Sequence, residues 1–227
     1  MTTVVVVGEG QTEETFVRDI VAPNFAERGL YIEPRLVRTS RYAKGGALSF
    51  ARVERFLQST LRERRDTYVT TFFDLYRIDA GFPGYSQAKS LQDPLAQASA
   101  LESALAEHIV SNVEVPRDRF VPHIQPYEFE SVLFSDVSRF ADLYPLWTPQ
   151  AAILAKVVEN APSPEHINDG ESTHPSARLA TLRNPRYQKV LDGSRLAEMI
   201  GLPAMRERCF HFAKWHDWLE SLASQSR

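Results

Sequence analysis

The chain has 227 residues, of which 43% are hydrophobic and 24% charged, and a formal net charge of −3. These values are typical of a soluble globular α/β-sized domain, and they exclude a chain whose overall charge draws it to nucleic acid. The single cysteine, Cys209, excludes an intramolecular disulfide, and the short apolar run near the N-terminus predicts neither a signal peptide nor a membrane span. We therefore expect a cytoplasmic protein with no membrane partner.

Strand and helix patterns alternate over the first 134 residues. Four strands are predicted, at residues 3–7, 30–37, 68–73 and 120–124. Three helices are expected between them: one beginning near Thr12 as its N-cap and ended or kinked by Pro23, one at 48–65 and one at 95–110. This β-α-β-α-β-α-β order predicts an α/β fold with a parallel sheet and helices on both faces.

The pattern changes from Ser135 onward, where short helical pieces alternate with Pro, Asn and Gly and no strong strand signal returns. The sequence therefore predicts an α/β domain at residues 1–134 and a helical C-terminal region at residues 135–227 that packs on it.

Acidic residues follow three of the four predicted strands. Glu9 follows the first strand, Asp74 the third, and Glu128 and Glu130 the fourth, while Glu13 lies one helical turn beyond Glu9. Ligands bind beyond the carboxyl ends of the strands in such sheets, and clustered carboxylates repel one another unless a cation neutralises them. Because Mg²⁺ and Mn²⁺ prefer hard oxygen ligands, the sequence predicts a site for one of these ions.

Each acid also has a structural explanation. Glu13 suits the first turn of a helix as well as it suits a metal site, and Asp74 suits a turn into a glycine-rich loop. Glu128 and Glu130 share a face on a strand but diverge at a helix start, so we expect one of them, preferably Glu130, to point at the site. The glycines around Glu9 match neither a dinucleotide-binding nor a Walker A pattern.

Several segments resemble a known family. The stretch Val7-Gly8-Glu9-Gly10-Gln11-Thr12-Glu13 resembles the opening motif of Toprim domains, especially those of overcoming-lysogenization-defect (OLD) type nucleases. The remaining chain is similar to a family catalogued as domain of unknown function 4276. The segments that carry this second similarity are Phe73-Asp74-Leu75-Tyr76, Phe82-Pro83-Gly84, Glu128 to Phe134, Ile167-Asn168-Asp169-Gly170, Pro175 to Leu179 and Cys209 to Phe212.

The resemblance implies a Toprim-like fold, metal-dependent phosphodiester chemistry, and frequent association with AAA or ABC-type ATPases in bacterial anti-phage defence. Glu9 matches the Toprim glutamate, Glu13 the second glutamate of the OLD-type motif, and Asp74 the first aspartate of the Asp-x-Asp motif. We expect Glu9 and Asp74 to be catalytic residues and metal ligands, although Glu9 suits either metal ligation or general-base catalysis. Glu13 is expected to complete the ligand set on this side.

The second position of the Asp-x-Asp motif departs from the family pattern, because it holds Tyr76. Asp79 and Glu130 are the candidates to supply the missing ligand, which leaves open whether one or two metal ions bind. The best-placed cation to face a phosphate is Arg77, three residues beyond Asp74. Four further candidate cations are Arg41, Lys89, Arg178 and Lys189.

The sequence thus supports three classes of function. The first is a Mg²⁺- or Mn²⁺-dependent nuclease, or nuclease subunit, with DNA or RNA as its substrate. The second is a non-catalytic Toprim-like module that regulates a partner ATPase, as the missing aspartate indicates. The third is a metal-dependent phosphoryl-transfer enzyme acting on a small nucleotide, which a near-neutral chain permits.

Overall fold

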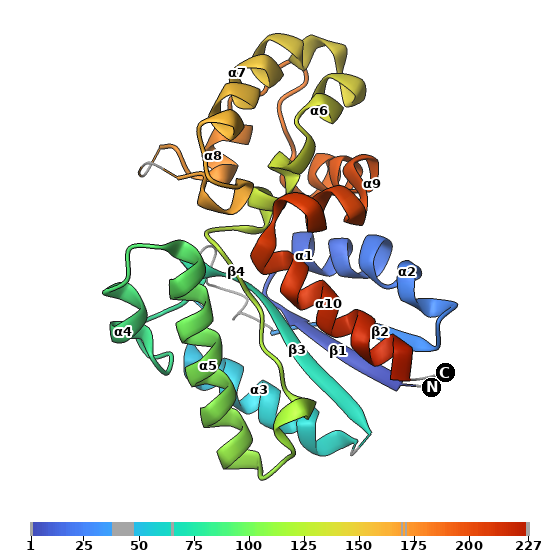
Figure 1. The fold of residues 1–227 in the computed structure, drawn as a ribbon, viewed down its shortest axis with the longest axis vertical. Helices are drawn as coiled ribbons and strands as arrows, with labels where there is room; N and C mark the ends of the chain where they lie inside the picture. Colours follow the sequence, from blue (N-terminus) through green and yellow to red (C-terminus); the bar gives the residue numbers. More distant parts are fainter. Residues whose placement is uncertain (1, 38–47, 65, 169, 171, 226–227) are drawn as a thin grey trace.

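Four parallel strands form the centre of the molecule, in the order β2-β1-β3-β4 (Figure 1). The structure, a computed structural model, describes residues 2–37, 48–64, 66–168, 170 and 172–225. The strands are β1 (Thr2–Gly8), β2 (Leu30–Leu36), β3 (Thr67–Asp74) and β4 (Ile124–Gln125). The α/β fold with an all-parallel sheet is therefore confirmed.

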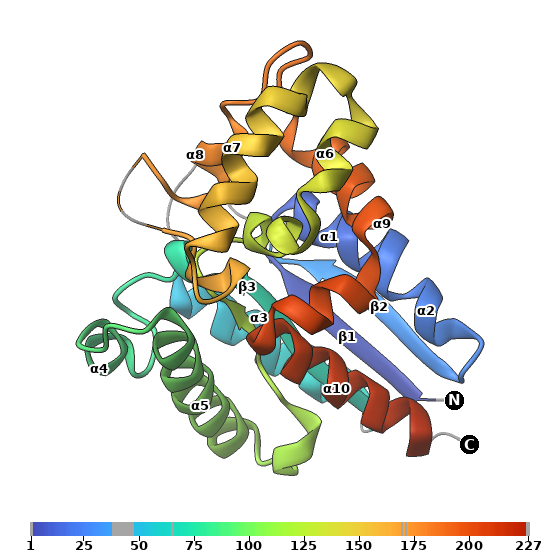
Figure 2. The ribbon, with the colours of Figure 1, turned by 45° about the horizontal axis from the view of Figure 1, so that its top comes forward.

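Helices cover both faces of this sheet (Figures 1 and 2). Successive β1 side chains point to opposite faces, so Val4 and Val6 lie in one core cluster while Val5 and Val7 lie in the other. On the second face the cluster is completed by α3 (Phe50–Glu63) and α5 (Pro94–Val113), and the short α4 (Tyr85–Lys89) packs beside α5. Both faces of β1 are thus buried, as its unbroken valine run predicts.

The first helical segment differs from the expectation at its start. The N-cap is Gly10, and Thr12 lies buried inside α1 (Gln11–Phe16), so the predicted Thr12 cap is wrong. A π-helical turn, η1 (Val17–Val21), and α2 (Pro23–Ala26) continue the segment, with the Ala22 N–H donating to the Val17 carbonyl at 2.8 Å. Pro23 begins α2, where its missing N–H costs nothing.

The fourth strand is much shorter than the predicted 120–124 segment. Only Ile124–Gln125 pairs as a strand, although Phe120 forms an isolated bridge with Val69. The ladder is interrupted because Pro122 has no N–H and the His123 N–H donates to the Thr71 hydroxyl at 3.0 Å.

The C-terminal region is helical, and no strand follows Gln125 in the described part of the chain. After η4 (Phe129–Asp136), it forms α6 (Ser138–Leu143), α7 (Thr148–Glu159), α8 (Pro175–Leu179), α9 (Lys189–Arg208) and α10 (Phe210–Gln225). Gly201 interrupts α9 with a φ of 78°, a conformation that favours glycine. None of the helices that the structure describes has the length and apolar character needed to cross a membrane.

The last helix ties the C-terminal region to the sheet. Figure 1 shows α10 lying along the face opposite α3 and α5, and its Trp215 indole N–H donates to the Thr70 hydroxyl of β3 at 3.0 Å. The Glu165 carboxylate accepts hydrogen bonds from the N–H groups of His211 and Phe212, at 2.8 and 2.9 Å, and so caps the start of α10. One hydrophobic core therefore includes side chains from both ends of the chain.

Candidate functional site

Carboxylates gather at the carboxyl end of the parallel sheet. Glu9 directly follows β1, Asp74 is the last residue of β3, and Glu130 lies in η4, just beyond β4. The charges of Glu13, Glu130 and Glu9 all act on Asp74. We refer to Glu9, Glu13, Asp74 and Glu130 as the acidic cluster, which lies where ligands bind in open α/β sheets.

Glu9 is the most exposed acid of the cluster, and its pKa is strongly shifted. Its side chain is 12% exposed, and its Oε1 lies 3.5 Å from the Arg77 Nε. Burial and the neighbouring charge of Glu13 raise the pKa of Glu9 to about 7, although Arg77 and Lys189 oppose the shift. Glu9 is thus poised to exchange a proton near neutral pH, or to ionise fully when a cation binds.

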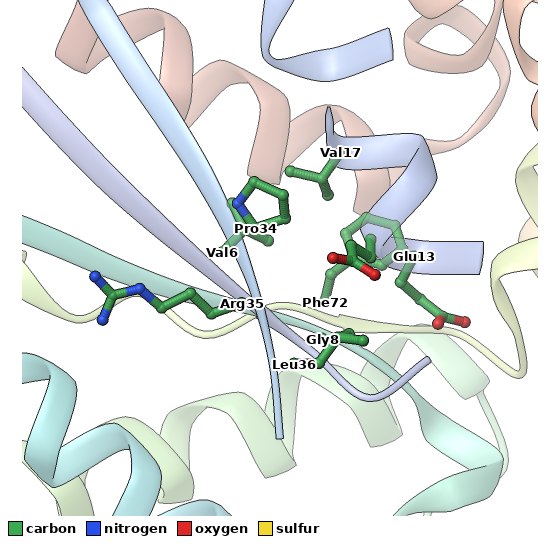
Figure 3. Close-up of a pocket in the computed structure, with 9 residues that line it drawn as sticks. Val6, Gly8, Glu13, Val17, Pro34, Arg35, Leu36 and Phe72 are labelled. Atoms are coloured by element: carbon green, nitrogen blue, oxygen red, sulfur yellow. The ribbon is translucent and has the colours of Figure 1, made fainter. Parts of the chain in front are cut away.

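Glu13 reaches the cluster because a glycine precedes it. A Cβ placed on Gly10 would lie 2.6 Å from the Glu13 Oε2, so the absence of a side chain lets this carboxylate approach the loop. Figure 3 shows Glu13, from α1, beside Gly8 of β1, Leu36 of β2 and Phe72 of β3, in a shallow depression. The Glu-Gly-x-Thr-Glu motif therefore folds so that its glutamates meet at the end of the sheet.

Asp74 is buried and holds the next part of the site in place. Its Oδ1 accepts a 2.7 Å hydrogen bond from the N–H of Phe129, the first residue of η4. Burial and the charge of Glu13 raise the pKa of Asp74 well above its usual value. The Asp74 carboxyl group therefore positions the helix turn that carries Glu130.

Glu130 is fully buried and relies on a single counterion. Its Oε1 lies 3.0 Å from the Nζ of Lys189, the first residue of α9, and no described residue otherwise gives either oxygen a well-formed hydrogen bond. Burial raises the pKa of Glu130. Burial alone would lower the pKa of Lys189, but the charges of Glu130 and Asp74 outweigh it and hold this pKa above its usual value.

Within the described residues, the acidic cluster has more carboxyl groups than counterions. Four acids face two described cationic groups, Lys189 and Arg77, and three of the acids have raised pKa values. No three of these acids each bring an oxygen within 4.8 Å of the others, as far as the described residues go. Mg²⁺ takes only one or two carboxylates directly and keeps several waters, so the cluster has the type of ligand that a hydrated ion would need.

Two of the predicted acids lie elsewhere. Asp79 accepts a 2.9 Å hydrogen bond from the Gly81 N–H and shapes the loop after β3, and none of the shifts in the acidic cluster is caused by it. The Glu128 carboxylate accepts hydrogen bonds from both the N–H and the hydroxyl of Ser176, each at 2.9 Å. Glu128 therefore diverges from Glu130, because η4 begins between them.

Tyr76, at the position of the expected second aspartate, also has another role. Its hydroxyl accepts a hydrogen bond from the Asn168 amide, and its ring packs against the rings of Tyr127 and His174. It thus connects the loop after β3 to the C-terminal region.

The candidate cations divide in the same way. Lys189 and Arg77 contact acids of the cluster. Lys89 instead lies over the Tyr85 ring, 5.6 Å from its centroid, and Arg178 donates from Nε to the Thr173 carbonyl. Arg41 lies outside the described residues.

Sequence reasoning did not bring together a second group, Glu102, His123 and His211, whose ligand atoms all lie within 4.8 Å of one another. Glu102 lies 21 positions before His123, and His123 lies 88 positions before His211. No local sequence pattern predicts that these side chains meet. The three side chains meet because the start of α10 packs next to α5 and β4, and this tertiary contact has no signal in the sequence.

Comparison with known proteins places the chain in a family. The sequence profile described as a domain of unknown function (DUF4276) matches residues 8–220, nearly the whole chain. No curated protein and no solved structure matches it. The matched span includes every member of the acidic cluster, Arg77 and Lys189. The chain therefore belongs to the DUF4276 family.

Proposed function

We propose that this protein is a Mg²⁺- or Mn²⁺-dependent nuclease, or nuclease subunit, with a Toprim-like active site at the acidic cluster. The observation that carries the proposal is that, in the described part of the chain, buried carboxyl groups outnumber cations at the carboxyl end of a parallel sheet. Such an arrangement is costly for the apo protein and is relieved when a divalent cation binds. The motif from Val7 to Glu13, which resembles that of Toprim domains, supports the assignment.

Each residue has a role in this proposal. Glu9, Glu13, Asp74 and Glu130 are the residues that would hold the ion, and a bound divalent cation would supply Lewis-acid stabilisation of a phosphodiester. The side chain of Arg77 is 43% exposed, and its guanidinium would bind a phosphate oxygen of the substrate. Glu9 either ligates the ion or, with a pKa of about 7 in the metal-free protein, accepts a proton from the attacking water.

The surroundings of Lys189 support a polyanionic substrate. An open depression of about 660 Å³ borders this residue and is also lined by Arg18, Gln188, Leu191 and Arg195. Its basic side chains would contact the phosphates of a strand, whose bases would lie on the apolar part of the wall. Asp19 also lines the depression and pairs with Arg18, so Lys189 and Arg195 are the cations of this lining that would contact a phosphate. An AAA or ABC-type ATPase partner and a role in anti-phage defence remain part of the proposal.

Cleavage assays test the proposal directly. We expect the wild-type protein to cleave DNA or RNA oligonucleotides with Mg²⁺ or Mn²⁺ and to lose activity in EDTA. Glu9→Gln and Asp74→Asn should each abolish cleavage without unfolding the protein, whereas Asp79→Asn should not, because Asp79 bonds to Gly81 outside the cluster. Cleavage of mononucleotides in preference to oligonucleotides would indicate the small-nucleotide enzyme. Absence of cleavage, even with an ATPase partner present, would contradict catalysis.

A non-catalytic regulatory module is the second candidate, and Lys189 favours it. The ammonium group of Lys189 already lies 3.0 Å from Glu130. It therefore neutralises part of the negative charge that a metal ion would otherwise neutralise. Tyr76, at the expected aspartate position, is engaged with Asn168. This alternative predicts that the protein binds no Mn²⁺ in calorimetry and that Glu9→Gln leaves binding to an ATPase partner intact. Calorimetry with Mn²⁺ therefore separates the two candidates.

A further inference from the structure

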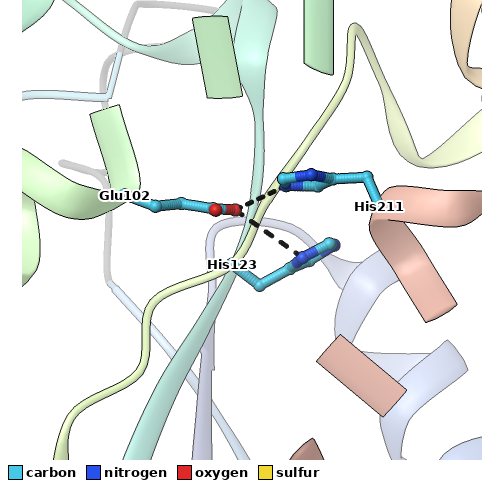
Figure 4. Close-up of side chains that lie close together, drawn as sticks. All are labelled: Glu102, His123 and His211. Carbon is cyan, nitrogen blue, oxygen red and sulfur yellow. Dashed lines mark hydrogen bonds and ion pairs between the residues drawn. The ribbon is translucent and has the colours of Figure 1, made fainter. Parts of the chain in front are cut away.

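A second group of ligand-bearing side chains lies next to β4, and it shares no residue with the acidic cluster. It consists of Glu102 from α5, His123 just before β4 and His211 at the start of α10 (Figure 4). We infer that Glu102, His123 and His211 form a binding site for a transition-metal ion, with Zn²⁺ as the best-suited ion. This inference is independent of the proposed nuclease activity.

The three side chains converge on one carboxylate oxygen. The Oε1 of Glu102 lies 2.7 Å from the Nε2 of His211 and 3.8 Å from the Nδ1 of His123. The two imidazole rings stack with centroids 5.2 Å apart, so both nitrogens face the same small region (Figure 4). Two imidazoles and one carboxylate form a ligand set found at Zn²⁺ sites that keep a fourth position for water.

The hydrogen-bond network fixes the tautomer of His123 in favour of metal binding. The Gln125 amide Nε2 donates to the Glu165 carboxylate at 3.2 Å and to the Ser131 hydroxyl at 3.0 Å. The other end of this amide, Oε1, therefore faces the His123 Nε2 at 3.1 Å and must accept its proton. The Nδ1 of His123 is then left with a lone pair that points toward Glu102.

A lone pair facing a carboxylate oxygen across 3.8 Å is unfavourable unless a cation lies between them. The amide of Gln125 is the kind of partner that orients a metal-binding histidine through its second nitrogen. The geometry thus leaves a specific place for a metal ion.

The backbone also holds the ligands in position. The Thr71 hydroxyl donates to the His123 carbonyl at 2.8 Å and accepts from the His123 N–H at 3.0 Å. The Ile124 N–H donates to the Glu102 Oε1 at 2.7 Å. The Trp215 ring stacks on His123 with centroids 5.3 Å apart and limits its rotation. Two of the three ligands are therefore fixed before the ion arrives.

The two distances to the Glu102 carboxylate require only a small adjustment. Tetrahedral Zn²⁺ with bonds of about 2.0–2.1 Å separates its ligand atoms by roughly 3.3 Å. The contact between Glu102 and His211 must widen by about half an ångström, and the gap between Glu102 and His123 must close by a similar amount. The Glu102 side chain is 17% exposed, which leaves a path for the ion and for a water as the fourth ligand. Mg²⁺ is a poor occupant, because it prefers oxygen ligands.

The experiment uses the full-length protein dialysed against EDTA and titrated with Zn²⁺ or Co²⁺. We expect one equivalent to bind, with the visible absorption of four-coordinate Co²⁺, and a rise in Tm of roughly 5–10 °C at a hundredfold excess of free Zn²⁺ over its Kd. Glu102→Gln and His211→Gln should weaken binding roughly tenfold or more. Each keeps a hydrogen-bonding group at its position, and circular dichroism in EDTA verifies that it folds.

Two controls separate this site from others. Glu54 and His108 form a contact of the same kind at 2.7 Å, with no third ligand among the described residues, so Glu54→Gln should leave Zn²⁺ affinity unchanged. The Glu9→Gln, Asp74→Asn double variant should also retain Zn²⁺ binding here. Failure of the stripped protein to bind Zn²⁺ or Co²⁺ would overturn the inference. Binding that survives Glu102→Gln and His211→Gln, or that is lost in the double variant, would also overturn it.

Discussion

The Nζ of Lys189 lies 3.0 Å from the Oε1 of Glu130, so the first residue of α9 supplies the counter-charge for a carboxylate with no exposed surface. Removing one partner of such a pair leaves the other charge buried and unpaired. The side chain of Lys189 is itself 39% exposed, which moderates the effect.

We therefore expect Lys189→Met to lower the free energy of unfolding by about 1–3 kcal/mol, measured by urea denaturation at pH 7 without metal. Adding Glu130→Gln in the same chain should recover most of the loss, because the buried charge is then removed. Arg206→Met is the matched control, since the exposed Arg206–Asp217 pair should contribute less than about 0.5 kcal/mol. An equal loss of unfolding free energy in Lys189→Met and Arg206→Met would contradict this account.

The raised pKa of Glu9 predicts a specific pH dependence of stability. The pKa rises from 4.5 to about 7 on folding, so between these values the folded state holds a proton that the unfolded state has released. The contribution of Glu9 to stability is therefore fully present below pH 4.5 and is lost as the pH rises through 7. Relative to wild type, Glu9→Gln should gain stability over this window, by up to about 3 kcal/mol.

Urea denaturation from pH 4 to pH 8 measures this difference. Glu198→Gln, on the exposed surface of α9, is the control and should show no such trend. Saturating Mg²⁺ should reduce the difference, because the ion favours the ionised carboxylate of the wild type. If the difference in unfolding free energy between Glu9→Gln and wild type is the same from pH 4 to pH 8, the pKa of Glu9 is not shifted by folding.

Gly10 and Gly8 offer a test of how the loop positions Glu13. A Cβ on Gly10 would lie 2.6 Å from the Glu13 Oε2, whereas a Cβ on Gly8 would have no contact closer than 3.5 Å. The backbone φ of Gly10 is −134°, so alanine is tolerated there and the substitution displaces mainly the carboxylate. We expect Gly10→Ala to weaken Mn²⁺ binding by roughly tenfold, measured by calorimetry, through this displaced ligand. Gly8→Ala should change it by less than about threefold, and the reverse order would contradict the model of the loop.

Glu128 and Glu130 should have separable effects although only one residue lies between them. Glu130 faces Lys189 and interacts with Asp74, whereas Glu128 binds the N–H and hydroxyl of Ser176 at the start of α8. Glu130→Gln should weaken Mn²⁺ binding by roughly tenfold. Glu128→Gln should leave Mn²⁺ binding unchanged and instead lower Tm slightly, through the weakened α8 cap. Calorimetry and thermal denaturation of both variants distinguish the two roles, and an equal loss of Mn²⁺ affinity would contradict them.

Local patterns were sufficient to predict most of the sheet and the grouping of acids at its carboxyl end. The valine run of β1 and the apolar run of β3 are buried on both faces, so their sequences carry the signal of central parallel strands. Parallel pairing then brings the residues after these strands, Glu9 and Asp74, to one edge. The functional roles of these acids remain predictions.

The misplaced features depend on contacts that local sequence does not encode. The predicted strand at 120–124 is shortened because a side chain, the Thr71 hydroxyl, takes the His123 N–H. Asp79 accepts a hydrogen bond from the Gly81 N–H within its own loop. Glu128 accepts one from the N–H of Ser176, a residue of α8 that lies far along the chain. The group of Glu102, His123 and His211 is formed in the same way, by α10 packing back onto β4. Tertiary contacts of this kind have no periodic signature.

The pairing of Lys189 with Glu130 has a consequence for biosynthesis. Glu130 emerges from the ribosome before its counterion at position 189 has been made. A nascent chain that stops short of α9 therefore carries Glu130 without the ammonium group that neutralises it. The charge of Glu130 is therefore balanced only after residue 189 has been translated.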